Sequence, residues 1–152
     1  MIKNLIAILI LILLNQCGYT PVYKGNTKSD ISISLINMEG DKEFNYKINS
    51  KLRKYYNNNS ENNYLISVKS SIENNTITKD SKGKTTNYEI IATTRFKISY
   101  KGEDNILVLK ENLKIEYNDD SFEQKKYENT IKNNFASSMI EKLIMKLNTL
   151  KW

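Results

Sequence analysis

Three segments between residues 64 and 117 alternate apolar with polar residues, and this pattern restricts the fold more than any other feature of the chain. Successive side chains of a strand point to opposite faces, so each segment predicts a strand with one buried face. Glu111 interrupts the third segment, and we expect a β-bulge near it. The apolar positions that share a parity are Ile66, Val68 and Ile72, then Tyr88, Ile90, Ala92, Phe96, Ile98 and Tyr100, and finally Leu107, Leu109, Leu113, Ile115 and Tyr117.

Short polar turns separate these predicted strands. Residues 78–84 place Gly83 where a turn is expected, and residues 101–105 form a second tight turn. The first strand is expected over 64–72, with an extension to Ile77. A shorter alternating segment, 31–35, predicts a fourth strand earlier in the chain. The resulting sheet has one apolar face that must be covered.

Two segments with helical spacing can provide the cover. Residues 41–56 carry apolar side chains every three or four positions, after a Gly40-Asp41 turn that supplies an N-cap. From Phe122 onward the periodicity is the strongest in the chain, and residues 118–121 offer capping side chains. The apolar stripe of this second helix is Ile131, Phe135, Met139, Leu143 and Leu147, widened by Ile140, Ile144 and Leu150.

The order of elements is therefore β-α-β-β-β-α. This order predicts an α+β fold, a two-layer sandwich with two helices packed on one face of a four-stranded sheet. One domain of this kind accounts for residues 31–152.

Residues 1–16 have the composition of a signal peptide. Lys3 precedes an apolar run from Leu5 to Leu14, which is about half the length of a membrane-spanning helix. A buried core helix is the alternative reading of this run. Cys17, the only cysteine, follows directly and has no partner for an internal disulfide.

The composition excludes several classes of function. The chain has no histidine and one cysteine, so zinc centres, histidine acid–base chemistry and thiol catalysis within the domain are not expected. Asp119 and Asp120 precede a helix, where capping explains them, and no glycine-rich phosphate loop is present. We expect no enzyme, no catalytic residue, no metal and no cofactor. A pI of about 9.2 with interleaved Tyr and Lys suits a nucleic-acid binder, but the export signal and the lack of a recognition motif argue against one.

The segment Leu14-Asn15-Gln16-Cys17 resembles a bacterial lipobox, with Gln16 where a small residue is usual. The resemblance implies cleavage before Cys17, a diacylglycerol on its thiol and an acyl chain on its new amine. Several acyl chains anchor a protein stably to a bilayer. Gly18, in place of an aspartate, implies sorting to the outer membrane. The alternative is a free thiol near a cleavage point.

The residues after the cysteine extend the resemblance. Cys17-Gly18-Tyr19-Thr20-Pro21-Val22-Tyr23 is similar to the mature N-terminus of the lipopolysaccharide-assembly lipoproteins of the LptE family, alphaproteobacterial type. That family has two helices on one side of a four-stranded sheet. The resemblance implies a signal peptide over 1–16, a lipid-anchored linker over 17–30 and an LptE-like domain over 31–152.

The same resemblance implies a function. Members of the family are anchored to the inner leaflet of the outer membrane on its periplasmic side. They plug the LptD β-barrel, assist its assembly and help to deliver lipopolysaccharide to the cell surface. A generic periplasmic lipoprotein, or a pilot subunit of another secretion pore, would share the anchor and differ in its partner.

Lysines at two places are the candidate lipopolysaccharide contacts. The resemblance places the lipid A-binding region of the family near the turn at Gly83 and near the start of the last helix. Ser81 and Gln124 stand where cations would be expected, and lysines flank both. The candidate residues are Lys79, Lys82, Lys84, Lys125 and Lys126, which we expect to act by their summed charge.

Overall fold

A computed structural model describes residues 31–56, 60 and 62–149 of the 152-residue chain. Its element order confirms the α+β fold expected from the sequence. The signal peptide, Cys17 and the linker over 17–30 lie outside the described residues. The elements are β1 (Ile31–Gly40), α2 (Lys42–Leu52), a 3₁₀ turn η2 (Arg53–Tyr55), β2 (Asn62–Lys79), β3 (Thr85–Tyr100), β4 (Glu103–Glu116) and α3 (Ser121–Thr149).

The four strands form one sheet in the order β1-β2-β3-β4. β3 runs antiparallel to both of its neighbours, whereas β1 runs parallel to β2, from the pair Ile31–Asn62 to the pair Gly40–Ser70. Parallel strands need a crossover connection, and α2 lies within it. The capping prediction for α2 is confirmed, because the Asp41 carboxylate accepts a 2.7 Å hydrogen bond from the backbone N–H of Phe44.

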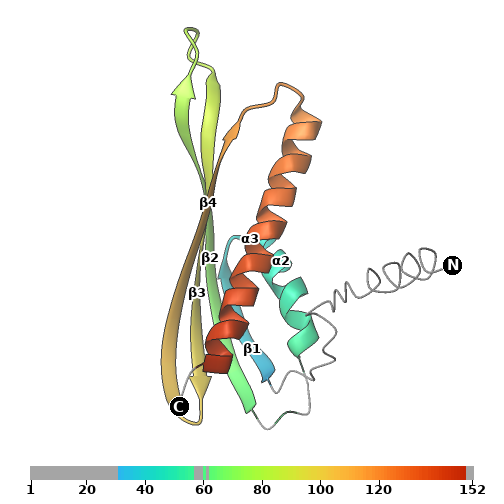
Figure 1. Cartoon of the computed structure of the whole chain (residues 1–152), viewed down its shortest axis with the longest axis vertical. Coiled ribbons are helices and arrows are strands. Elements are labelled where there is room, and N and C mark those ends of the chain that lie inside the picture. The colour runs from blue at the N-terminus through green and yellow to red at the C-terminus, as the bar shows by residue number, and fades with distance from the viewer. Residues whose placement is uncertain (1–30, 57–59, 61, 150–152) are drawn as a thin grey trace, which may run out of the picture.

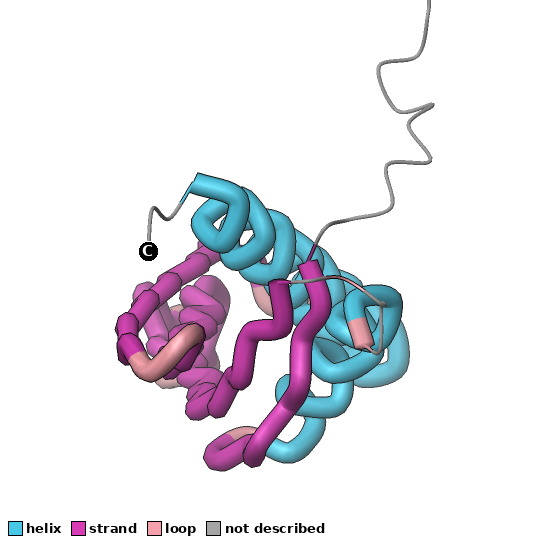
Figure 2. Tube along the Cα trace, turned by 90° about the horizontal axis from the view of Figure 1, so that it is seen from below, coloured by secondary structure: helices cyan, strands magenta, loops and turns pink. Residues whose placement is uncertain are grey.

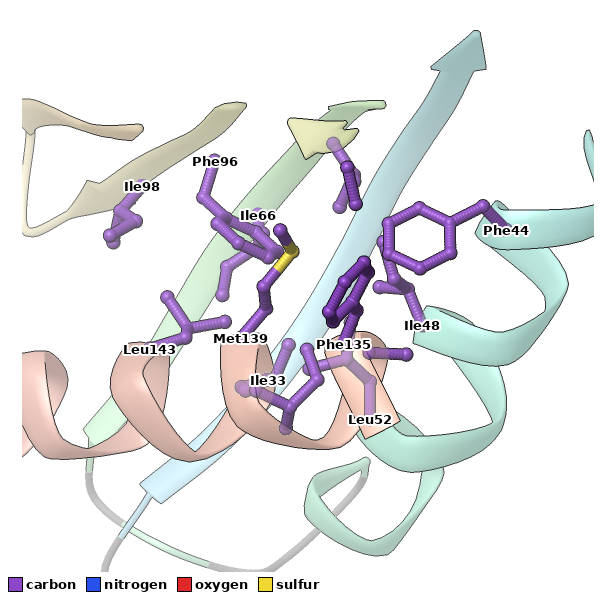
Figure 3. Close-up of a cluster of buried hydrophobic side chains, with 14 of the residues drawn as sticks. Ile33, Phe44, Ile48, Leu52, Ile66, Phe96, Ile98, Phe135, Met139 and Leu143 are labelled. Carbon is purple, nitrogen blue, oxygen red and sulfur yellow. The ribbon is translucent and has the colours of Figure 1, made fainter. Parts of the chain in front are cut away.

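Both helices lie on the same face of the sheet (Figures 1 and 2). Met139 and Leu143 of α3 meet Phe96 and Ile66 of the central strands in the core (Figure 3). Each large side chain buried in this way stabilises the fold by about 1.5–3 kcal/mol. Five predicted positions of the α3 stripe are confirmed as buried, and Leu150 lies outside the described residues. The five are Ile131, Phe135, Met139, Leu143 and Leu147.

The strands in the structure extend beyond the apolar patterns that predicted them. The extension of β2 to Ile77 is confirmed, and the strand ends at Lys79. Gly83 occupies the left-handed region at φ +82°, as a turn glycine should. The second turn is shorter than residues 101–105, since only Lys101 and Gly102 separate β3 from β4. Within the described residues, neither helix combines the length and apolar character needed to cross a membrane.

The bulge predicted near Glu111 was wrong. The register between β3 and β4 runs without a shift from the pair Asn87–Glu116 to the pair Tyr100–Glu103, and Glu111 lies opposite Ala92. The Glu111 carboxylate points to the helix side, where it accepts hydrogen bonds from Lys142 at 2.6 Å and Ser138 at 2.8 Å. Glu111 can therefore occupy a position on the side of the strand that is otherwise apolar, because the helix that covers this side supplies its hydrogen-bond partners.

Replacing Glu111 with Gln is expected to flatten the acid limb of the stability curve. Burial opposes the charge of Glu111, but the hydrogen bonds from Lys142 and Ser138 and the Lys142 charge outweigh it and lower its pKa below the ordinary 4.5. Its contribution is therefore complete above about pH 4.5 and is lost as the pH falls through the folded-state pKa. Urea unfolding between pH 7 and pH 3 should show a smaller loss of stability for Glu111→Gln than for the parent chain.

Glu116→Gln is the matched control, because Glu116 lies on the same strand and is exposed. Equal acid slopes for the parent chain and Glu111→Gln would contradict the role given to this carboxylate.

Candidate functional site

The first lysine group lies on the β2–β3 hairpin, which extends past the end of β4 (Figure 1). The Asp80 carboxylate accepts hydrogen bonds from the backbone N–H groups of Lys82 and Lys84, at 2.8 and 2.9 Å. These bonds order the loop while leaving Lys79, Lys82 and Lys84 exposed to solvent. The sequence therefore folds the tip into a defined loop that displays three cations.

Lys84 differs from the other two because it binds the connection between β4 and α3. Its amine pairs with the Asp119 carboxylate and lies 5.5 Å from the ring centroid of Tyr117. The hydrogen bond to Asp119 is the main cause that raises the pKa of Lys84. None of the ion pairs among the described residues includes Lys79 or Lys82, so these two amines are the charges that the tip offers to a ligand.

The second lysine group lies in the first turns of α3. Lys126 pairs with Glu123 at 3.5 Å, and Lys125 has no ion pair among the described residues. Both line an open hollow between the start of α2 and the start of α3. Phe122, which is 71% exposed, and the carboxylate of Glu43 lie in the same hollow.

Lysines of the protein itself neutralise Glu43, one of the two carboxylates that line this hollow. Glu43 binds Lys132 at 3.1 Å and Lys47 at 3.5 Å. The hydrogen bond from Lys132 is the largest effect on Glu43, and together with the charges of Lys132 and Lys47 it outweighs desolvation and lowers its pKa. Lys126 shares its charge with Glu123, so Lys125 is the lysine of this group that has no ion pair among the described residues.

The structure places the two lysine groups at the same end of the sheet without merging them (Figure 1). The hairpin group contacts the β4–α3 connection, and the α3 group lines the hollow beside α2. Each group presents amines that are exposed to solvent.

Gln124 belongs to a buried polar network, which the sequence did not reveal. The Gln124 side chain is 5% exposed and donates a 2.9 Å hydrogen bond to Glu128 and another to the Tyr88 hydroxyl. Its carbonyl oxygen accepts from the backbone N–H of Asn118 at 2.8 Å. Burial raises the pKa of the Tyr88 phenol, and its hydrogen bond to Glu128 raises it further. Gln124 therefore positions the start of α3 and cannot replace a surface cation.

A second cationic surface was also missed. On the open face of the sheet, Lys69 lies directly opposite Arg95, and Lys110 lies one strand further, opposite Thr93. None of these three cations has an ion pair among the described residues. Like charges opposite each other on neighbouring strands are unfavourable, and Glu39 of β1, which lies opposite Lys69 on its other side, offsets part of this repulsion. The strand register brings these three cations together, and the sequence alone does not give that register.

Over residues 31–56, 60 and 62–149, no three side chains of the metal-binding types gather at one point.

Comparison with known proteins shows a shared fold. No protein-family model and no curated protein sequence matches the chain. The crystal structure of rare lipoprotein B from Shewanella oneidensis is similar at 10% identity and a TM-score of 0.56, covering 76% of this chain and 95% of that one. A Caulobacter crescentus structure described as a lipoprotein is similar at 11% identity and a TM-score of 0.55, covering 80% and 90%.

A minor lipoprotein from Acinetobacter baumannii gives the same result, at 12% identity and a TM-score of 0.51, covering 74% of this chain and 89% of that one. The described domain therefore shares its architecture with lipoproteins from these three bacteria.

Replacing Tyr88 with Phe is expected to destabilise the fold by about 1–3 kcal/mol, because Gln124 and Glu128 each lose a buried partner. Urea unfolding followed by circular dichroism measures the loss. Tyr127→Phe is the control, since Tyr127 lies on α3 beside Gln124 and Glu128, is 51% exposed and has no hydrogen bond through its hydroxyl among those of the described residues. Equal effects of the two substitutions would contradict the role of the network.

Proposed function

We propose that the chain is an outer-membrane lipoprotein, anchored by acyl groups on Cys17, that plugs the LptD β-barrel. It assists assembly of the barrel and the delivery of lipopolysaccharide to the cell surface. The observation that carries this proposal is the fold, which the chain shares with lipoproteins over about three quarters of its length. The resemblance of residues 17–23 to the LptE family supports the same assignment.

The position of Ile31 suits an anchored protein. The first described residue lies beside Asn62, at the end of the sheet opposite to the hairpin tip (Figure 1). The 14 residues from Cys17 to Ile31 reach at most about 50 Å, and an 18-residue strand such as β2 spans about 60 Å. An anchor on Cys17 therefore holds one end of the sheet near the bilayer and lets the lysine tip extend away from it.

The distal hairpin is polar and internally bonded, as a plug in a polar lumen requires. Thr78 and Thr86 bond across the strands at 2.7 Å, and Asn87 donates to Thr78 at 2.8 Å. All positions from Glu73 to Lys79 are exposed, and only one of them, Ile77, is a large apolar residue. Such a hairpin keeps its shape without burying an apolar face.

The exposed lysines supply the contact with lipopolysaccharide. A phosphorylated lipid meets Lys79 and Lys82 without first displacing an internal carboxylate. Lys84 would have to share its amine with Asp119, so its contribution is smaller. Because the amines are exposed, salt weakens the interaction, as expected for solvent-screened charges.

Purification of the tagged chain from its native cells tests the assignment. The parent chain should incorporate radiolabelled palmitate, fractionate with the outer membrane and bring down a large β-barrel together with lipopolysaccharide. Cys17→Ser should lose the label and membrane fractionation while keeping its fold. Recovery of an unlabelled, freely soluble parent chain would overturn the proposal, and a secretin ring as the partner would assign the chain to another pore.

Replacing Lys79 and Lys82 together with Ser should weaken lipopolysaccharide binding at low salt by about threefold to tenfold, the loss of two exposed charge contacts. Surface plasmon resonance on immobilised lipopolysaccharide measures the affinity. Lys101 and Lys146 replaced together with Ser form the control, because they remove the same charge from exposed positions at the opposite end of the sheet. Equal losses in the two variants would show that net charge alone decides the affinity.

A further inference from the structure

The open face of the sheet, which neither helix covers, carries exposed apolar side chains near one end (Figures 1 and 2). Ile106 and Val108 of β4 are 60% and 51% exposed, and Leu65 of β2 is 42% exposed. Ile106 lies opposite Lys97 and Val108 lies opposite Arg95, and direct partners share one face of a sheet. Leu65 shares this face, because it alternates with the buried residues of β2. Apolar surface is therefore left in contact with water at three positions of one face.

Two cations without an ion pair flank these side chains. Arg95 is directly opposite Val108, and Lys110 follows Val108 by two positions on the same face of β4. None of the ion pairs among the described residues includes Arg95 or Lys110. On the neighbouring strands Arg95 also meets Lys69, and Lys110 meets Thr93, so no carboxylate lies directly opposite either cation. The apolar side chains therefore stand beside positive charge that the fold leaves uncompensated.

The two parts of this face differ in charge. Between the pair Ser99–Asp104 and the pair Thr93–Lys110, four cations face two carboxylates, which leaves two positive charges. Toward the hairpin, one cation faces three carboxylates, which leaves two negative charges. The first part has Lys69, Arg95, Lys97 and Lys110 with Glu39 and Asp104, and the second has Lys114 with Glu73, Glu89 and Glu116. An anionic surface is therefore attracted to the first part and repelled by the second.

The positive part lies at the N-terminal end of the domain. Ile31 lies beside Asn62, three residues before Leu65, and β4 begins at the same end of the sheet. β4 is three strand spacings, or about 15 Å, from β1. The 14 residues from Cys17 to Ile31 reach at most about 50 Å. An acyl anchor on Cys17 can therefore bring this part of the face onto the bilayer.

We propose that this part of the open face rests on the anionic phospholipid surface of the membrane that holds the anchor, before the chain enters its barrel. The inference rests on the acyl anchor of the proposed function and adds a second membrane contact to it. The apolar side chains enter the headgroup region, and the two cations reach lipid phosphates from their aliphatic stems. The contact residues, here called the anchor-end patch, are Leu65, Arg95, Ile106, Val108 and Lys110.

A lipid surface suits the anchor-end patch better than a protein partner does. A stable protein interface uses about 20–30 residues on each side and needs complementary shape. A fluid bilayer adapts to the protein and accepts a patch of five side chains. Such a contact is weak by itself, but a short tether raises the effective concentration of the membrane into the millimolar range. The anchor therefore makes a weak contact sufficient to orient the domain.

Brominated lipids test this contact, because they quench only those tryptophans that reach the bilayer. The mature lipoprotein with Ile106→Trp and Trp152→Phe is reconstituted in vesicles of phosphatidylethanolamine and brominated phosphatidylglycerol. We expect strong quenching at low salt, and its loss at high salt or when brominated phosphatidylcholine replaces the anionic lipid. Ile77→Trp in the same background is the matched control, since Ile77 is 45% exposed and lies on the distal hairpin.

The cations are tested in the chain that carries Ile106→Trp. Lys110→Gln should lower the ratio of quenched to unquenched tryptophan by about fivefold, the loss of one basic contact at an anionic surface. Lys114→Gln is the charge control, because Lys114 lies on the same face of β4 in the negative part. Circular dichroism confirms that each variant folds, and Val108→Trp replaces Ile106→Trp if that variant does not.

Equal quenching of the two introduced tryptophans, in a palmitate-labelled chain that floats with the vesicles, would overturn this inference and leave the proposed function intact. Quenching that neither salt nor Lys110→Gln changes would do the same. An unquenched but blue-shifted tryptophan at position 106 would show that a protein surface covers the patch, and would also overturn the inference. A chain without palmitate that does not bind the vesicles would overturn the anchor and this inference together.

Discussion

The apolar face of the sheet is shielded from water only where a helix covers it. The lengths of α2 and α3 therefore determine where the two-layered part of the domain ends. β2 alternates buried and open positions as far as Ser70, and it is exposed throughout from Glu73 onward. Beyond the pair Thr76–Tyr88 there is no helix to cover either face of the hairpin (Figure 1). Burial can stabilise only the covered part, so the hairpin tip depends on hydroxyl and amide hydrogen bonds between its strands.

Much of this fold could be predicted from the sequence because its main signals are local. The parity of residues 88–100 and the spacing of Phe135, Met139 and Leu143 each describe one element and one face. The direction of β1 was not predictable in that way, since it depends on which strand lies beside it. Gly40 shows how closely β1 approaches β2 at this point. Its φ is +97°, and a Cβ there would lie 1.8 Å from the Ser70 carbonyl oxygen.

The lysines of the candidate site could be chosen from the sequence, but their arrangement in space could be predicted only in part. The lysines of the hairpin and of α3 are exposed and share one end of the sheet, yet they belong to separate surfaces. Sequence spacing could not show that Asp119 holds Lys84 or that Gln124 is buried against Tyr88, because those partners are more than thirty residues away. Lys69 and Arg95 are also distant along the chain, and only the strand register brings them together.

The two edges of the sheet are closed to different degrees. β1 is short, and Tyr56 forms a bridge to Ile33 that occupies part of its outer edge. β4 has 14 residues and relies on side chains for protection, with Glu111 turned inward and Lys110 and Lys114 on the open face. Glu103 and Asp104 lie at the other end of the strand, so charged side chains stand at both ends of this edge, and the apolar stretch from Ile106 to Leu109 lies between them.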